Sequence, residues 1–187
     1  MSFNVIAAVM QSLSPEVVTK IAASLGIDRA LALKAVSAMV PAILGTFARK
    51  AASPDGARHL VTVISAQDPG LLGQLGTVLG GPQEGAYIDY GSKLLRDAVG
   101  GPAAEGLVGA LGRYAGLDTK HSQNLFAVVA PVAAGTLANY DAANALGAEG
   151  LAKILGTQAD AFDKALPAGL LSHLGGELKP TAATPAP

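Results

Sequence analysis

The chain has 187 residues, of which 50% are hydrophobic and only 14% are charged. Apolar content this high excludes a chain that stays disordered over its whole length. The 13 basic and 14 acidic residues give a net charge of −1, which argues against a protein whose main work is wrapping nucleic acid. Because the chain has no Cys, it has no disulfide framework, no thiolate metal site and no cysteine nucleophile.

The segment at 1–10 is apolar and has no basic residue before its apolar run, so it does not resemble a secretory signal. We therefore expect a cytoplasmic protein. Two further apolar runs, at 36–47 and 125–137, would each extend no more than about 20 Å as a helix. A hydrocarbon core is about 30 Å thick, so the sequence predicts two buried core helices and no membrane span.

The first predicted helix begins at Ser14, whose side chain suits the N-cap position. It ends at Gly26, which can adopt the left-handed conformation of a helix C-terminus. Asp28 then caps a long helix over about 29–51. This helix is apolar on nearly all sides, which is typical of a central buried helix.

Pro41 lies inside the long helix, where its ring removes an amide hydrogen bond and predicts a kink. A further helix is predicted over about 53–66, followed by a short glycine-rich helix over about 69–79. Two Gly-Gly-Pro breaks then enclose a connector, 80–101, which contains one amphipathic helical segment at 88–99.

The second half of the chain repeats this plan. A helix over about 102–114 stops at Gly116. Asp118 caps a second long helix that runs to about residue 140 and carries Pro131 in its middle.

Three shorter helices are predicted next, near 147–156, 158–165 and 167–178. The final segment, 180–187, contains only Pro, Ala and Thr, and we expect it to be disordered. No stretch shows sustained alternation of polar and apolar residues, so the sequence predicts no sheet.

When one half of the chain is shifted by 90 residues, its helix-capping residues and its helix-interrupting prolines coincide with those of the other half. A constant shift of this kind indicates an internal repeat. The matched pairs are Gly26 and Gly116, Asp28 and Asp118, Pro41 and Pro131, and Gly45 and Gly135. We interpret the shift as the duplication of a helical unit, with repeats over about 14–79 and 102–178 joined by the connector at 80–101.

The predicted fold class is therefore all-α. We expect an internally duplicated multi-helical bundle, in which two kinked central helices are related by a pseudo-two-fold axis. One domain, 1–179, is expected to contain both repeats. Gly45 and Gly135 are expected where the two long helices cross, because glycine permits close approach.

Few residues are candidates for chemistry. The three histidines, His59, His121 and His173, are not spaced three or four apart, so no helix offers a two-histidine metal face. Ser53 and Asp55 lie close to His59 in the sequence, but Ser53 is needed as a helix cap, and closeness in sequence does not indicate a catalytic triad. The sequence therefore predicts no catalytic residue, no metal ligand and no cofactor.

The segment at 18–36 resembles a helix-turn-helix. A DNA-binding protein of this type places polar and basic residues at the start of its second helix. The candidates for nucleic-acid contact in the two copies are Arg29, Lys34, Lys120, Gln123 and Asn124. The second copy lies in a segment with more acidic than basic residues, so nucleic acid is not the partner that we expect.

Several motifs together resemble the YidB-like bacterial proteins of unknown function. These motifs are Leu25-Gly-Ile-Asp28, Met39-Val-Pro-Ala-Ile-Leu-Gly45, Lys50-Ala-Ala-Ser-Pro-Asp-Gly-Ala57, Asp68-Pro-Gly-Leu-Leu-Gly-Gln-Leu-Gly76 and Val129-Ala-Pro-Val-Ala-Ala-Gly135. The resemblance covers roughly residues 1–175. It implies an all-α, internally duplicated bacterial protein and brings no catalytic residue with it.

We expect a non-catalytic helical protein that binds itself or another protein through apolar helix faces. The reasons are the lack of any polar constellation and a mean hydropathy of +0.40. The alternative is a DNA-binding regulator that uses the helix-turn-helix-like segment. The third hypothesis, a small hydrolytic enzyme, requires a pocket lined by two or more of Asp28, Asp118, His59, His121 and Tyr114.

Overall fold

The computed structural model of the chain describes residues 3–68, 70–168 and 170, and all regular secondary structure within these ranges is helical. The predicted all-α class is therefore confirmed. The helices in this part of the chain are α1 (Val5–Ser12), α2 (Pro15–Leu25), α3 (Arg29–Ala51), α4 (Pro54–Ser65), α5 (Leu71–Val78), α6 (Glu84–Val99), α7 (Gly101–Ala115), α8 (Thr119–Asn144) and α9 (Gly147–Ala165).

Each of the two long helices begins with an aspartate cap that follows a left-handed glycine. The side chain of Asp28 accepts hydrogen bonds from amides in the first turn of α3, and Asp118 does the same for α8. Gly26 and Gly116 have φ angles of 67° and 73°, which a residue with a Cβ atom rarely adopts. The glycine and the aspartate together set the point at which one helix ends and the next begins.

Two predicted boundaries are wrong. The first predicted helix begins at Ser14, but α1 forms before it with Asn4 as its N-cap. The connector helix α6 begins at Glu84, one turn before the predicted start at residue 88. Glu84 accepts hydrogen bonds from the side chain of Ser24 and the amide of Gly80, which explains the earlier start.

The two helices predicted near 147–156 and 158–165 are instead the single helix α9. Leu151, Leu155 and Phe162 are fully buried and lie on one side of this helix, so packing favours continuity across Gly156. The helix predicted near 167–178 lies mostly outside the described residues, and the predicted tail at 180–187 lies entirely outside them.

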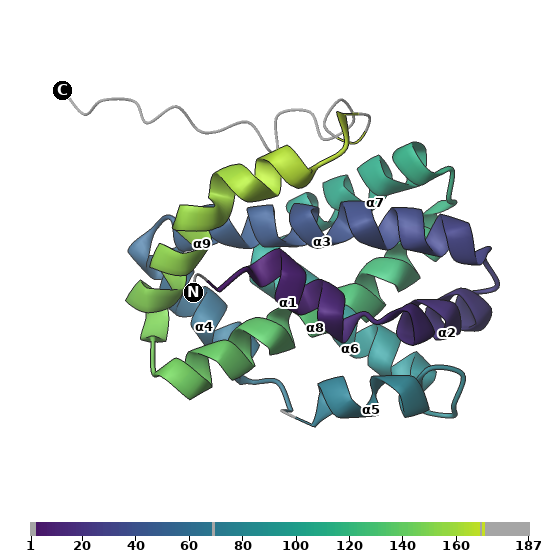
Figure 1. The fold of residues 1–187 in the computed structure, drawn as a ribbon, viewed down its shortest axis with the longest axis horizontal. Coiled ribbons are helices and arrows are strands. Elements are labelled where there is room, and N and C mark those ends of the chain that lie inside the picture. Colours follow the sequence, from purple (N-terminus) through teal and green to yellow (C-terminus); the bar gives the residue numbers. More distant parts are fainter. Residues whose placement is uncertain (1–2, 69, 169, 171–187) are drawn as a thin grey trace.

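The centre of the fold is formed by α3 and α8 (Figure 1). Pro41 and Pro131 lie inside them, and both helices continue through their prolines. Both prolines are buried. The hydroxyl of Thr46 donates a hydrogen bond to the carbonyl of Ala42, and that of Thr136 donates to the carbonyl of Val132. Burial against neighbouring helices stabilises these interrupted helices in a way that helix propensity alone does not.

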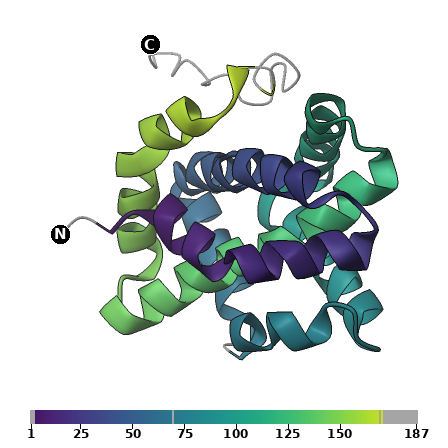
Figure 2. The ribbon, with the colours of Figure 1, turned by 45° about the vertical axis from the view of Figure 1, so that its right-hand side comes forward.

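The other helices surround α3 and α8 in a reciprocal arrangement (Figures 1 and 2). α2 packs on α3 and also contacts α8, whereas α7 packs on α8 and also contacts α3. α4 contacts α8, and α9 lies along α3. Buried side chains from both halves of the chain therefore belong to one hydrophobic cluster.

The N-terminal segment is held against the C-terminal part of the described chain. The side-chain amide of Gln158, on α9, donates to the carbonyl of Phe3 at 2.6 Å and accepts from the amide of Val5 at 3.0 Å. The ring of Phe3 stacks on that of Tyr140, with 3.6 Å between the ring centroids. These contacts join residues more than 130 positions apart.

The glycine pair expected at the crossing of the long helices lies elsewhere. A Cβ atom on Gly45 would be 3.8 Å from Phe162 of α9, and one on Gly135 would be 3.2 Å from Leu72 of α5. The closest helix approach at a glycine is instead at Gly91 of α6, where a Cβ atom would lie 1.7 Å from the carbonyl oxygen of Ala127. Spacing in the sequence shows which side of a helix a glycine occupies but not which helix faces it.

Two described helices, α3 and α8, are long and apolar enough to cross a membrane. The apolar runs at 36–47 and 125–137, each about 20 Å long as a helix, are thus only parts of α3 and α8. In the structure, 67% of the most apolar window of α3 and 72% of that of α8 are buried by other parts of the chain. The absence of a membrane span and the cytoplasmic location both stay predictions.

Candidate functional site

The first halves of α3 and α8 correspond residue by residue, but other helices cover them differently. Along α3 the exposed residues Ala30, Leu33, Lys34 and Ser37 recur at helical spacing and lie on one face. Leu33 is 49% exposed and is the one exposed large hydrophobic residue within the described residues. We call these four residues the open face of α3.

On α8 the corresponding residues Lys120 and Gln123 are also exposed and Asn124 is half-buried, but the fourth, Ala127, is covered by α6. Gly91 brings the backbone of α6 against that of α8 at Ala127, which is fully buried. Nearby, the hydroxyl of Tyr87 donates to the carbonyl of Val128 at 3.4 Å. Burial, with a smaller contribution from Tyr90, raises the pKa of Tyr87, so this phenol remains a protonated donor.

The residue of α3 that corresponds to Ala127 is Ser37, and it is exposed. No helix therefore approaches α3 there as α6 approaches α8. At one edge of the open face, the ammonium of Lys34 lies 4.9 Å from the ring centroid of Tyr114, at the end of α7. This contact holds the ammonium of Lys34 at the side of the open face that borders α7. Leu33 and Ser37 are therefore left as the uncharged middle of the open face.

The five candidates for nucleic-acid contact belong to this same pair of helix starts. Arg29, Lys34, Lys120 and Gln123 are exposed, and Asn124 is half-buried. The two helix starts lie at one end of the molecule, on the right in Figure 1. The structure therefore brings these residues to one end, although Lys34 contacts the ring of Tyr114 within the chain.

Gln123 also lines a shallow cavity of about 250 Å³ between α6, α7 and α8. Arg96 of α6 and Glu105 of α7 also line it, so the cavity has one cationic and one anionic side chain. A phosphate group favours a site with an excess of positive charge, which this cavity does not offer.

The sequence model of a family described as "Bacterial protein of unknown function (DUF937)" matches residues 7–140. The chain belongs to this bacterial family. The match agrees with the resemblance to YidB-like proteins that the sequence motifs show. No curated protein and no solved structure matches the chain.

The DUF937 match begins within α1 and ends within α8. It therefore includes both helix starts, the open face of α3 and the helix α6, which packs on α8 at Ala127. α9, which lies along α3, follows the matched residues.

The polar residues of this DUF937 protein that could take part in chemistry make structural contacts. The ring of His121 contacts the carboxylate of Asp118 at 2.7 Å, and its amide donates to the same group. These hydrogen bonds, with the backbone bond first, lower the pKa of Asp118. Ser53 accepts a hydrogen bond from the amide of Gly56 at 3.1 Å, as a helix cap does.

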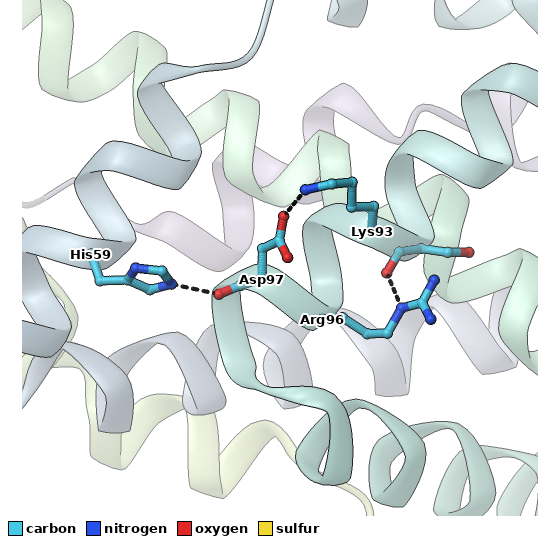
Figure 3. A network of polar contacts seen from close by, with 5 residues as sticks. His59, Lys93, Arg96 and Asp97 are labelled. Atoms are coloured by element: carbon cyan, nitrogen blue, oxygen red, sulfur yellow. Dashed lines mark hydrogen bonds and ion pairs between the residues drawn. The ribbon is translucent and has the colours of Figure 1, made fainter.

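His59 joins α4 to the end of α6 (Figure 3). Its Nε2 atom donates to the backbone carbonyl of Asp97 at 2.6 Å. The carboxylate of Asp97 pairs with Lys93, and Arg96 donates to the carbonyl of Ser92 at 3.3 Å. Ser92 enters this network through its backbone carbonyl, and the charged residues Lys93, Arg96 and Asp97 are exposed to solvent.

Within residues 3–68, 70–168 and 170, no three His, Cys, Asp or Glu side chains come together as a metal site. Four surface cavities of about 140 to 330 Å³ contain none of the five residues that the enzyme hypothesis needs in a pocket. His173 lies outside the described residues. The enzyme hypothesis therefore has no support from these cavities.

Proposed function

We propose that this DUF937 protein is a non-catalytic helical protein that binds a second copy of itself through the open face of α3. The observation that carries the proposal is the unequal covering of two corresponding helix faces. On α8 Ala127 is covered by α6, whereas the equivalent Ser37 of α3 is exposed beside the exposed Leu33. The small side chains of Ala30 and Ser37 next to one leucine suit close packing of two helices.

The apolar surface is smaller than the mean hydropathy of the chain suggested. Most apolar side chains are buried in the shared core, so the hydropathy reflects that core rather than several exposed helix faces. The proposed contact is therefore small, and we expect a reversible dimer rather than a permanent one.

In the proposed dimer the α3 helix of the second copy lies antiparallel to that of the first. In that arrangement, Leu33 and Ser37 of the two copies meet near the two-fold axis, as an isologous contact requires. Lys34 contacts Tyr114 of its own chain, which keeps its ammonium toward the edge of the contact.

Light scattering over a range of protein concentrations tests the proposal. We expect the wild-type mass to rise from monomer toward dimer with concentration, and Leu33→Asp to stay monomeric because its carboxylate would be buried without a partner. Asp160→Asn, an exposed residue of α9 that is not part of the open face, is the control and should behave as wild type. A wild-type monomer at every concentration would remove self-association as the function.

We further propose that the helix pairs α2–α3 and α7–α8 are two copies of one unit, related by a pseudo-two-fold axis within a single domain over 1–179. The support is the reciprocal packing and a set of matched contacts between paired helices. The matched residues, each 90 positions apart, are Ala22 and Gly112, Ile27 and Leu117, and Ala32 and Ser122. One calorimetric transition is expected, and two independent transitions would contradict the single domain.

DNA binding is the second candidate function. It is favoured by the position of both helix-turn-helix-like starts at one end of the molecule. The expected result is salt-sensitive binding to duplex DNA that weakens on replacing Arg29 and Lys120 by Ala. An unshifted duplex at low salt would remove this candidate.

A further inference from the structure

The shallow cavity of about 250 Å³ between α6, α7 and α8 has an apolar floor. Each helix contributes one large side chain to this floor, and Leu95, Val108 and Phe126 are 3%, 7% and 1% exposed. Ala127, where Gly91 of α6 packs on α8, also lines the cavity. A ligand with an aliphatic group would cover the apolar surface that remains at this floor and would gain from leaving water.

The rim of the cavity carries one positive and one negative side chain, on different helices. Arg96 belongs to α6 and Glu105 to α7, and both are exposed. The Nε atom of Arg96 donates to the carbonyl of Ser92, one turn earlier in the same helix, at 3.3 Å (Figure 3). This bond uses one nitrogen of the guanidinium and leaves the two terminal nitrogens, Nη1 and Nη2, as donors for a ligand.

The charges at this rim are unpaired, unlike the charges beside them. In the part of the chain that the structure describes, the side chain of Glu105 has no hydrogen bond or ion pair, and that of Arg96 has only its bond to Ser92. By contrast, Lys93 pairs with Asp97 on the same helix. A cation and an anion that line one cavity without pairing with each other fit a ligand that carries both charges.

We propose that this cavity binds a free α-amino acid with a branched aliphatic side chain, such as valine or leucine. The ligand carboxylate accepts hydrogen bonds from Nη1 and Nη2 of Arg96, an arrangement that matches the planar guanidinium. The ligand ammonium donates to the carboxylate of Glu105, and the aliphatic side chain lies on the apolar floor. A water molecule has a share of about 30 Å³ in the liquid, so the cavity has room for about eight heavy atoms, which suits these two amino acids.

NMR of the full chain tests whether these amino acids bind. We expect valine and leucine to shift the methyl signals of Leu95 and Val108 and the side-chain amide signals of Gln123, because all three residues line the cavity. Saturation is expected at about millimolar concentration, as is usual for ligands this small.

Three analogues of leucine separate the parts of the ligand. Leucinamide lacks the carboxylate and N-acetyl-leucine lacks the ammonium, so each should bind about fivefold more weakly than leucine. Glycine keeps both charges but has no aliphatic side chain to cover the floor, so it should bind about tenfold more weakly than leucine.

Two variants test the rim. Arg96→Gln and Glu105→Gln should each weaken the binding of leucine about fivefold, because each removes one charged partner. Both residues are exposed, so both variants should fold as the wild type does. Lys93→Gln is the matched control and should leave binding unchanged, because Lys93 is an exposed cation of the same helix that does not line the cavity.

The proposal is overturned if neither valine nor leucine shifts the Leu95 and Val108 signals at about 50 mM, a concentration far above the expected dissociation constant. It is also overturned if leucinamide, N-acetyl-leucine or glycine binds as tightly as leucine, or if either rim variant binds leucine as tightly as wild type. Self-association through the open face of α3 is measured separately, and the Leu33→Asp variant should bind leucine as wild type does. A failure here therefore leaves the proposed function standing.

Discussion

Gly91 is the residue whose substitution tests the packing of the fold most sharply. A Cβ atom at this position would lie 1.7 Å from the carbonyl oxygen of Ala127, 2.6 Å from its carbonyl carbon and 3.0 Å from its Cα atom. All three are backbone atoms of a fully buried part of α8, so no side chain can rotate to make room. Gly91→Ala therefore requires α6 to move away from α8.

The magnitude follows from two opposing effects. Overpacking a well-packed core costs about 1–3 kcal/mol, and a clash with buried backbone lies at the upper end of that range. Alanine in place of glycine returns up to about 1 kcal/mol of helix propensity. The expected net destabilisation is therefore about 2 kcal/mol, which corresponds to a fall in melting temperature of about 4–8 °C for a chain of this size.

Urea denaturation followed by circular dichroism measures this difference. Gly156→Ala is the matched control, because Gly156 is exposed within α9 and a Cβ atom there would meet nothing within 4 Å. We expect this control to raise stability by up to about 1 kcal/mol. If Gly91→Ala is as stable as wild type, α6 does not cross α8 at this residue.

Three further predictions concern polar groups. Ser122→Ala should raise the free energy of unfolding by about 1 kcal/mol in urea denaturation, because the buried Ser122 hydroxyl has no hydrogen-bond partner; a loss of stability would show that the hydroxyl is satisfied. Gln158→Ala should lower the melting temperature and speed hydrogen exchange at Val5, whose amide loses its acceptor; unchanged exchange would contradict this clamp. The pKa of Asp118 is lowered in the folded state, so its contribution is present above the usual carboxyl pKa and is lost as pH falls through the lowered value. Asp118→Ala should therefore be less stable than wild type at neutral pH, and this difference should shrink on acidification; a difference that does not change with pH would refute the role of the ionised cap.

Local signals in the sequence predict where the two long helices begin. Asp28 and Asp118 each follow a glycine by two positions, and this pattern depends only on neighbouring backbone groups. The N-cap of α1, Asn4, is a signal of the same kind, and it could have predicted that helix.

Contacts between distant helices could not be predicted in the same way. Gly45 and Gly135 correspond in sequence, but α9 faces the first and α5 faces the second. Gly91, which makes the close approach, lies in the connector and has no partner in the repeat. Leu33 has the hydrophobicity of a core residue, and its exposure follows from the absence of a helix over that part of α3.

Oxidative cross-linking of a single cysteine at position 33 tests the proposed self-association most directly. The chain has no Cys, so Leu33→Cys introduces one thiol at the centre of the open face. A disulfide forms only when the two Cα atoms come within about 7 Å, which the antiparallel contact between two copies of α3 brings about. We predict rapid formation of a covalent dimer by Leu33→Cys and only slow formation by Gly156→Cys on the exposed side of α9. Equal, slow cross-linking of both variants would contradict the open face of α3 as the contact between copies.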